Sequence, residues 1–153
     1  MKPKSPIRPA LAAFAATAGL AIGSAAWAAP LPPIQTQGGV TFTSGGIGRG
    51  EATAMQAQAS RWPLTLEFAV RQRKGSDDAF VADVKVQVLD GQQRRVLDSV
   101  SKGPFLLARL DPGRYEIKAT FGGETLTREI HLTAGHPLRE VFVWPHGLEK
   151  TAS

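Results

Sequence analysis

The sequence predicts an all-β protein: a single seven-stranded antiparallel β-sandwich with one short helix packed on it. Three observations predict this fold. From residue 64 onwards, apolar residues alternate with polar residues at a period of two, which is typical of strands with one buried face. Turns that contain glycine or proline separate these runs at short, regular intervals. The length of 153 residues and the hydrophobic fraction of 42% fit one domain with tails.

Residues 1–28 are expected to be a cleaved signal peptide rather than part of the fold. Three basic residues precede an apolar stretch at 11–22, and residues 26–28, Ala-Trp-Ala, match the small-residue cleavage pattern. The apolar stretch, at ~12 residues, is shorter than the ~20 that a membrane-spanning helix needs. The sequence therefore predicts export to the periplasm, with secretion as the alternative, and no transmembrane segment in the mature chain.

Cleavage would change the charge of the protein. The whole chain has 18 basic and 13 acidic residues, and the segment 1–28 holds three basic and no acidic side chains, so the mature chain has a net charge of +2. This balance does not favour a nucleic-acid partner. The absence of cysteine excludes disulfides, thiolate metal sites and cysteine nucleophiles.

A Pro/Gly-rich N-terminal segment at 29–50 precedes the first regular element. Its prolines disfavour a helix, and we expect a tail or an ordered loop in which 40–43 could be a short strand. A short helix is predicted at 51–61, where Ala52, Met55 and Ala59 fall on one side at helical spacing. Proline at position 63 ends it, because the residue before a proline avoids helical angles.

The β-sandwich is expected at 62–145, followed by a polar C-terminal tail at 146–153. Its seven predicted strands are 64–71, 84–88, 95–100, 105–110, 115–121, 126–132 and 139–144. The predicted turns are a charged one at 74–78, Asp-Gly at 90–91, Asp-Pro-Gly at 111–113 and Gly-Gly at 122–123.

The stretch 103–115, Gly-Pro-Phe-Leu-Leu-Ala-Arg-Leu-Asp-Pro-Gly-Arg-Tyr, resembles the G-x-f-x-f-x-x-L-x-P-G-x-Y core of carboxypeptidase regulatory-like domains. Those domains are transthyretin-like, prealbumin-type sandwiches. The resemblance covers roughly 64–144 and implies a structural turn motif, in which Leu110 and Tyr115 enter the core and Pro112-Gly113 reverses the chain. The mature chain also resembles small exported proteobacterial proteins of this type, to which no function is assigned.

No complete catalytic or metal-ligating set is found, so no catalytic residue, metal or cofactor is predicted, and the protein is not expected to be an enzyme. His131 and His136 bracket a turn, but a metal site would want a third ligand, for which Glu140 is the available carboxylate. The one enzymatic hypothesis, which ranks behind two non-enzymatic ones given below, is a hydrolase related to transthyretin. Those enzymes end in Tyr-Arg-Gly-Ser, whereas residues 149–153 are Glu-Lys-Thr-Ala-Ser.

The glycine-rich loop at 45–51 leads into the predicted helix without matching a phosphate-loop pattern. Arg49 and Glu51 on this loop are the candidate residues that face a partner. The first hypothesis is therefore a non-enzymatic exported module that binds another envelope protein. The alternative is a module that binds a small molecule or carbohydrate. A carbohydrate platform would require Trp62 and Trp144 to be exposed, whereas we expect Trp62 in the core.

Overall fold

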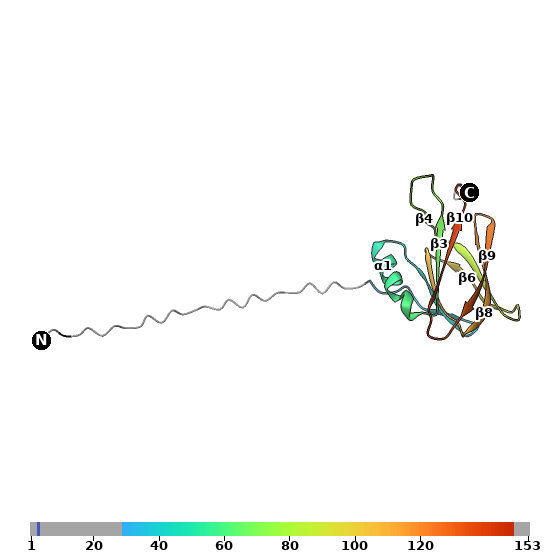
Figure 1. Ribbon diagram of the computed structural model, residues 1–153, viewed down its shortest axis with the longest axis horizontal. Coiled ribbons are helices and arrows are strands. Elements are labelled where there is room, and N and C mark those ends of the chain that lie inside the picture. Colours follow the sequence, from blue (N-terminus) through green and yellow to red (C-terminus); the bar gives the residue numbers. More distant parts are fainter. Residues whose placement is uncertain (1–2, 4–28, 149–153) are drawn as a thin grey trace.

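The computed structural model describes residue 3 and residues 29–148. The predicted signal peptide, apart from residue 3, and most of the predicted C-terminal tail lie outside the described residues. Two β-sheets face each other, and one helix lies on the outer side of the larger sheet (Figure 1). No helix in the described part of the chain has the length and apolar character to cross a membrane.

The regular elements are named in chain order. They are β1 (Gln35–Gln37), β2 (Val40–Gly45), α1 (Arg49–Gln58), the 3-10 turn η1 (Ala59–Arg61), β3 (Leu64–Val70), β4 (Ala79–Phe80), β5 (Val84–Asp90), β6 (Arg95–Ser101), β7 (Phe105–Arg109), β8 (Gly113–Phe121), β9 (Glu124–Leu132) and β10 (Leu138–Trp144).

The larger sheet has the strand order β1-β2-β7-β3-β10, with β4 also paired to β3, and the smaller sheet has the order β6-β5-β8-β9. The β-sandwich prediction is confirmed, but two finer predictions are wrong. The described residues contain ten strands rather than seven. The pairing of β3 with β10 is parallel, whereas an antiparallel sandwich was predicted. The alternation of apolar residues identifies a strand, but it does not carry the strand's direction.

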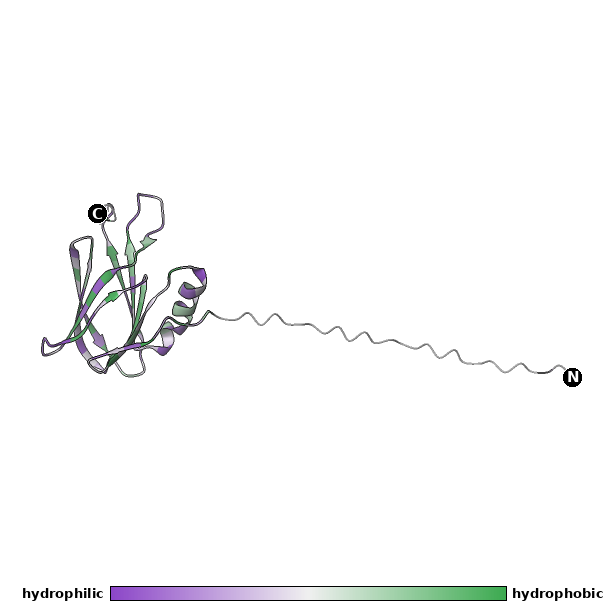
Figure 2. Cartoon of the chain, turned by 180° about the vertical axis from the view of Figure 1, so that it is seen from behind, coloured by the Kyte–Doolittle hydropathy of each residue, from purple (hydrophilic) through white to green (hydrophobic). Residues whose placement is uncertain are grey.

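The main core lies between the two sheets. Its fully buried members include the alternating valines of β5. It also contains a group of aromatic rings in which Phe68 lies tilted against Phe142 and Trp144, and the latter two are stacked on each other. The indole N–H of Trp144 donates a hydrogen bond to the Glu124 carbonyl at 2.9 Å, which ties β10 to the start of β9. Figure 2 shows hydrophobic residues concentrated along the strands.

Helix α1 begins two residues earlier than the predicted helix, and its predicted last turn is the separate 3-10 turn η1. Together they bury a second apolar cluster against the outer face of the larger sheet: Met55, Trp62, Phe105 and Leu107. Strand β7 is therefore covered on both faces, which explains its continuous apolar run in place of an alternating pattern.

The segment 29–50 is an integral part of the sandwich, because it supplies β1 and β2. Phe42 of β2 is buried in the main core, and β2 pairs with β7 along five residues. Gln37 of β1 joins the two sheets: its side-chain amide donates to the Asp98 carbonyl at 3.0 Å and accepts from the Asp98 N–H at 2.6 Å. The sandwich therefore begins well before the predicted boundary at residue 62.

Candidate functional site

The glycine-rich loop between β2 and α1 is held tightly against the larger sheet. Gly46 has a φ of 101° and Gly48 has a φ of 84°, a backbone conformation that side chains other than glycine rarely adopt. A Cβ atom at Gly46 would overlap the ring of Phe105. The loop therefore needs glycine here both for its backbone angles and for its close approach to the second apolar cluster.

The structure separates the two predicted partner-facing residues. Glu51 is half-buried, and its Oε1 accepts a hydrogen bond from the backbone N–H of Gly46 at 2.7 Å. Its carboxylate thus fastens the loop to the first turn of α1. Arg49 is exposed, and within residues 29–148 its guanidinium has no ion-pair partner. Arg49 is therefore the one of the two that presents an unused charge to solvent.

An exposed apolar hollow lies beside Arg49, and we call it the Ile47–Phe80 surface. The side chains of Ile47 and Phe80 are 65% and 53% exposed, although both are large and hydrophobic. The residues that line the hollow are Gly46, Ile47, Gly48, Arg49, Ala52, Phe80, Val81, Ala82 and Pro104. Ile34, Val100 and Val141 are also exposed, but none of them lines this hollow.

Phe80 is held in place by packing and backbone pairing. Its ring lies 5.5 Å from the ring of Phe105, between centroids, and β4 pairs it with Ala69 of β3. The next residue, Val81, donates its N–H to the Phe68 carbonyl at 3.1 Å. Neither Phe80 nor Ile47 is among the site residues predicted from the sequence. The sequence did contain a signal for them: Ile47 is a large apolar residue within the glycine-rich loop, and Phe80 is one just after the charged turn at 74–78. Neither belongs to an alternating pattern that would place it in the core.

A second hollow lies at the opposite end of α1, around Trp62 and His136, and has a volume of about 400 Å³. We call it the Trp62–His136 hollow. Trp62 itself is only 3% exposed, and the guanidinium of Arg109 lies 4.4 Å above the centroid of its ring. Trp144 is fully buried. The burial of Trp62 in the core is confirmed, and an exposed two-tryptophan platform for carbohydrate, which the alternative hypothesis required, is contradicted.

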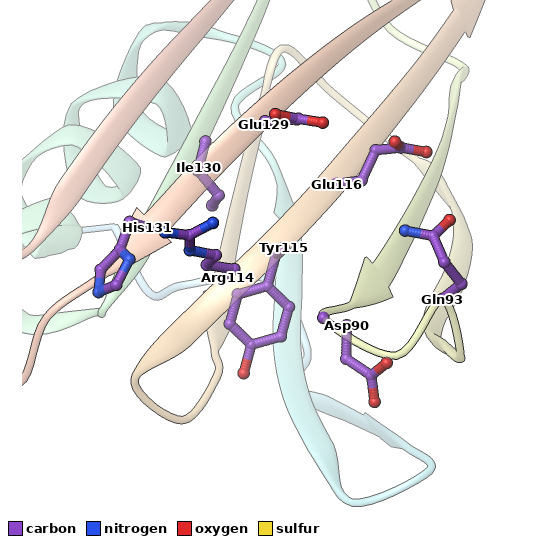
Figure 3. Close-up of a pocket in the computed structure, with 9 residues that line it drawn as sticks. Asp90, Gln93, Arg114, Tyr115, Glu116, Glu129, Ile130 and His131 are labelled. Carbon is purple, nitrogen blue, oxygen red and sulfur yellow. The ribbon is translucent and has the colours of Figure 1, made fainter.

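A third hollow lies on β8 and β9, beside the turn between β5 and β6 (Figure 3). The Tyr115 hydroxyl points away from Glu116 and Glu129 there, and it donates a hydrogen bond to the Asp111 carbonyl at 2.7 Å. Burial raises the pKa of Tyr115, and the charges of Asp111 and Asp90 add to that rise. The phenol is thus protonated and engaged in holding a turn, which is a structural role.

The predicted turn motif connects the two sheets and does not form a hairpin within one of them. Leu110 is buried, Gly113 has a φ of 151°, and Tyr115 packs partly buried against the core, while Pro112 is exposed. However, β7 belongs to the larger sheet and β8 to the smaller one. The motif therefore carries the chain from one sheet to the other.

The histidines are not gathered into a ligand set. His131 lines the third hollow, and His136 lines the Trp62–His136 hollow. Among residues 29–148 no group of three or more histidine, aspartate or glutamate side chains is arranged to hold a metal ion.

No protein-family model matches the chain, and no curated protein matches it either. The resemblance to carboxypeptidase regulatory-like domains therefore stays a prediction.

Proposed function

We propose that this chain is an exported, non-enzymatic protein of the cell envelope, of the carboxypeptidase regulatory-like type, that binds another envelope protein through the Ile47–Phe80 surface. The observation that carries the proposal is the pair of large apolar side chains exposed on one hollow. Adjacent exposed apolar groups of this kind mark interaction sites more often than isolated ones do. The predicted signal peptide supports the location in the periplasm.

The surface is already organised for binding. The hydrogen bond between Glu51 and Gly46 holds one side of it, and the contact between Phe80 and Phe105 holds the other. A partner would therefore order few additional groups, which lowers the entropic cost of association. Fully burying a side chain such as phenylalanine or isoleucine contributes about 1.5–3 kcal/mol, so covering the exposed halves of both would supply a substantial part of a binding free energy.

The charge at the rim specifies the chemistry of the partner. Arg49 lines the hollow and has no ion-pair partner in the described part of the chain. Glu51, the acidic side chain in the same first turn of α1, is engaged with the backbone N–H of Gly46. The complementary surface is therefore an apolar side chain of a partner protein with a carboxylate beside it. Arginine suits this role because its planar group can pair with both carboxylate oxygens.

The test places a photo-crosslinking phenylalanine derivative at position 80, in the cells that naturally make the protein. The matched control carries the same group at Val100, which is 49% exposed on β6. We expect one discrete adduct from position 80 and none from position 100. The crosslinked protein is then identified, purified and titrated with the mature chain.

In that titration, Phe80→Ser and Arg49→Glu should each weaken binding by about tenfold or more, as the loss of an anchoring side chain does, and Val100→Thr should leave it unchanged. Equal adducts from both positions, or no adduct, would overturn the proposal. An adduct between two copies of this chain, with a dimer in light scattering, would replace the envelope partner by self-association.

A further inference from the structure

The Trp62–His136 hollow combines an apolar base with a cationic rim. It forms where η1, the connection between β7 and β8, and the return between β9 and β10 meet. Its lining contains Arg61, Arg109 and His136, and no acidic residue among the described ones.

Arg109 is positioned by its neighbours rather than by a carboxylate. Its guanidinium stacks on the ring of Trp62, and its Nη1 donates to the Arg61 carbonyl at 3.5 Å. A guanidinium has five N–H donors, so most of them remain available. Neither Arg61 nor Arg109 forms an ion pair within residues 29–148. Stacking on an aromatic ring preorganises an arginine for an anion, because the planar group is held in one orientation.

We propose that this hollow binds a small organic anion, whose apolar body rests on the leucine and proline side chains and whose anionic group meets Arg61 and Arg109. The apolar part of the lining includes Pro112 and Pro137, which are exposed, and Leu110 and Leu132, which are buried. The volume of about 400 Å³ falls within the range of small-molecule sites, which are mostly apolar with a few polar groups. Asp111 is exposed next to Leu110 but does not line the hollow.

The Trp62–His136 hollow is separate from the proposed partner surface, because the two lie at opposite ends of α1 and share no residue. It also gives the small-molecule alternative a definite location and ligand class. The ligand is recognised by one anionic group and one apolar group of modest size, such as an aromatic carboxylate.

The test uses two matched fluorescent probes on the mature chain, 29–153. The first is 8-anilinonaphthalene-1-sulfonate, an aromatic anion, and the second is N-phenyl-1-naphthylamine, the same ring system without the sulfonate. We expect the anionic probe to bind at one site, and the neutral probe to bind about tenfold more weakly or worse, because it lacks the anionic group that would pair with the two arginines. An aromatic carboxylate, 4-biphenylcarboxylate, should displace the anionic probe, and 4-phenylphenol should not.

The variants locate the binding site. Arg61→Gln/Arg109→Gln should weaken binding of the anionic probe by about tenfold or more, while the neutral probe is unaffected. The matched control, Arg71→Gln/Arg73→Gln, removes the same charge from two exposed arginines of the loop after β3 and should change neither. Because Arg109 also packs on Trp62, the single variant Arg61→Gln is included. It keeps that stacking and should still weaken binding of the anionic probe.

Three results would overturn the proposal. The first is equal binding of the two probes, which would leave an apolar hollow without anion recognition. The second is an equal loss in the control variant, which would reduce the effect to net charge. The third is the absence of binding at this hollow, seen either as no signal in any protein or as a signal that Phe80→Ser loses while both arginine variants keep it. The third result would leave the proposed partner surface untouched, so the two proposals fail separately.

Discussion

Replacing Glu51 by alanine tests whether this carboxylate holds the glycine-rich loop on the sheet. The substitution removes the acceptor of the Gly46 N–H, which is a hydrogen bond of 2.7 Å. Gly46 is buried, so its N–H is left without a partner in the folded protein. The substitution also removes a negative charge from the first turn of α1, where the helix dipole favours it.

The size of the effect follows from these contacts. A hydrogen bond to a charged group contributes about 1.5–3 kcal/mol, and the cost is of that order because the buried donor stays unsatisfied. The charge near the helix N-terminus contributes about 0.3–1 kcal/mol. We therefore expect Glu51→Ala to lower the free energy of unfolding by about 2 kcal/mol. Glu51→Gln keeps an oxygen acceptor and should lose about half as much.

The assay is urea unfolding of the mature chain, followed by tryptophan fluorescence. The matched control is Glu129→Ala, because Glu129 is exposed and lies opposite Glu116 on the neighbouring strand. Its removal should change the unfolding free energy by less than about 0.5 kcal/mol. If the Glu51→Ala protein is as stable as the Glu129→Ala protein, Glu51 does not hold the loop on the sheet. Arg49→Ala should also leave stability unchanged, because its side chain is exposed and unpaired within residues 29–148.

Three further predictions concern the sandwich. Phe42→Ala should lower the unfolding free energy by about 3–5 kcal/mol in the same urea assay, since Phe42 is 2% exposed; a loss below about 1 kcal/mol would mean that 29–50 is dispensable. Trp144→Phe should cost about 1–3 kcal/mol in thermal unfolding, because the Glu124 carbonyl loses its indole donor. Tyr115, the single tyrosine of the chain, should ionise in ultraviolet absorbance titration above its ordinary pKa of 10.0. Because the folded-state pKa is raised, Tyr115 contributes stability below pH 10, and this contribution is lost as the pH rises through the folded-state pKa.

How far the sequence predicted the fold depended on how each strand is buried. Strands β5 and β8 have one face in the core, so their alternating residues identify them clearly. Strand β1 is exposed along its whole length, and β4 contains two residues, so neither leaves a pattern. Strand β2 is buried but rich in threonine, serine and glycine, and its role in the sheet comes from pairing with β7 rather than from its own composition.

The candidate site was predicted only in part. The glycine-rich loop was identified from its composition, and Arg49 does lie exposed beside an apolar hollow. The sequence could not separate Arg49 from Glu51, because a hydrogen bond to the backbone of a residue five positions away has no signature in composition. Phe80 was missed because its neighbours in space, Phe105 and Ile47, are distant in the sequence.

The Ile47–Phe80 surface and the Trp62–His136 hollow both depend on the apolar cluster beneath α1. Phe105 of that cluster packs against Phe80 at one end of the helix, and Trp62 packs against Arg109 at the other. A helix of ten residues is too short to be stable alone, so it persists because Met55 packs into this cluster. The cluster thus supports two separate surfaces. Substituting the exposed residues of one surface should abolish binding there alone, whereas detaching α1 from the cluster should abolish binding at both.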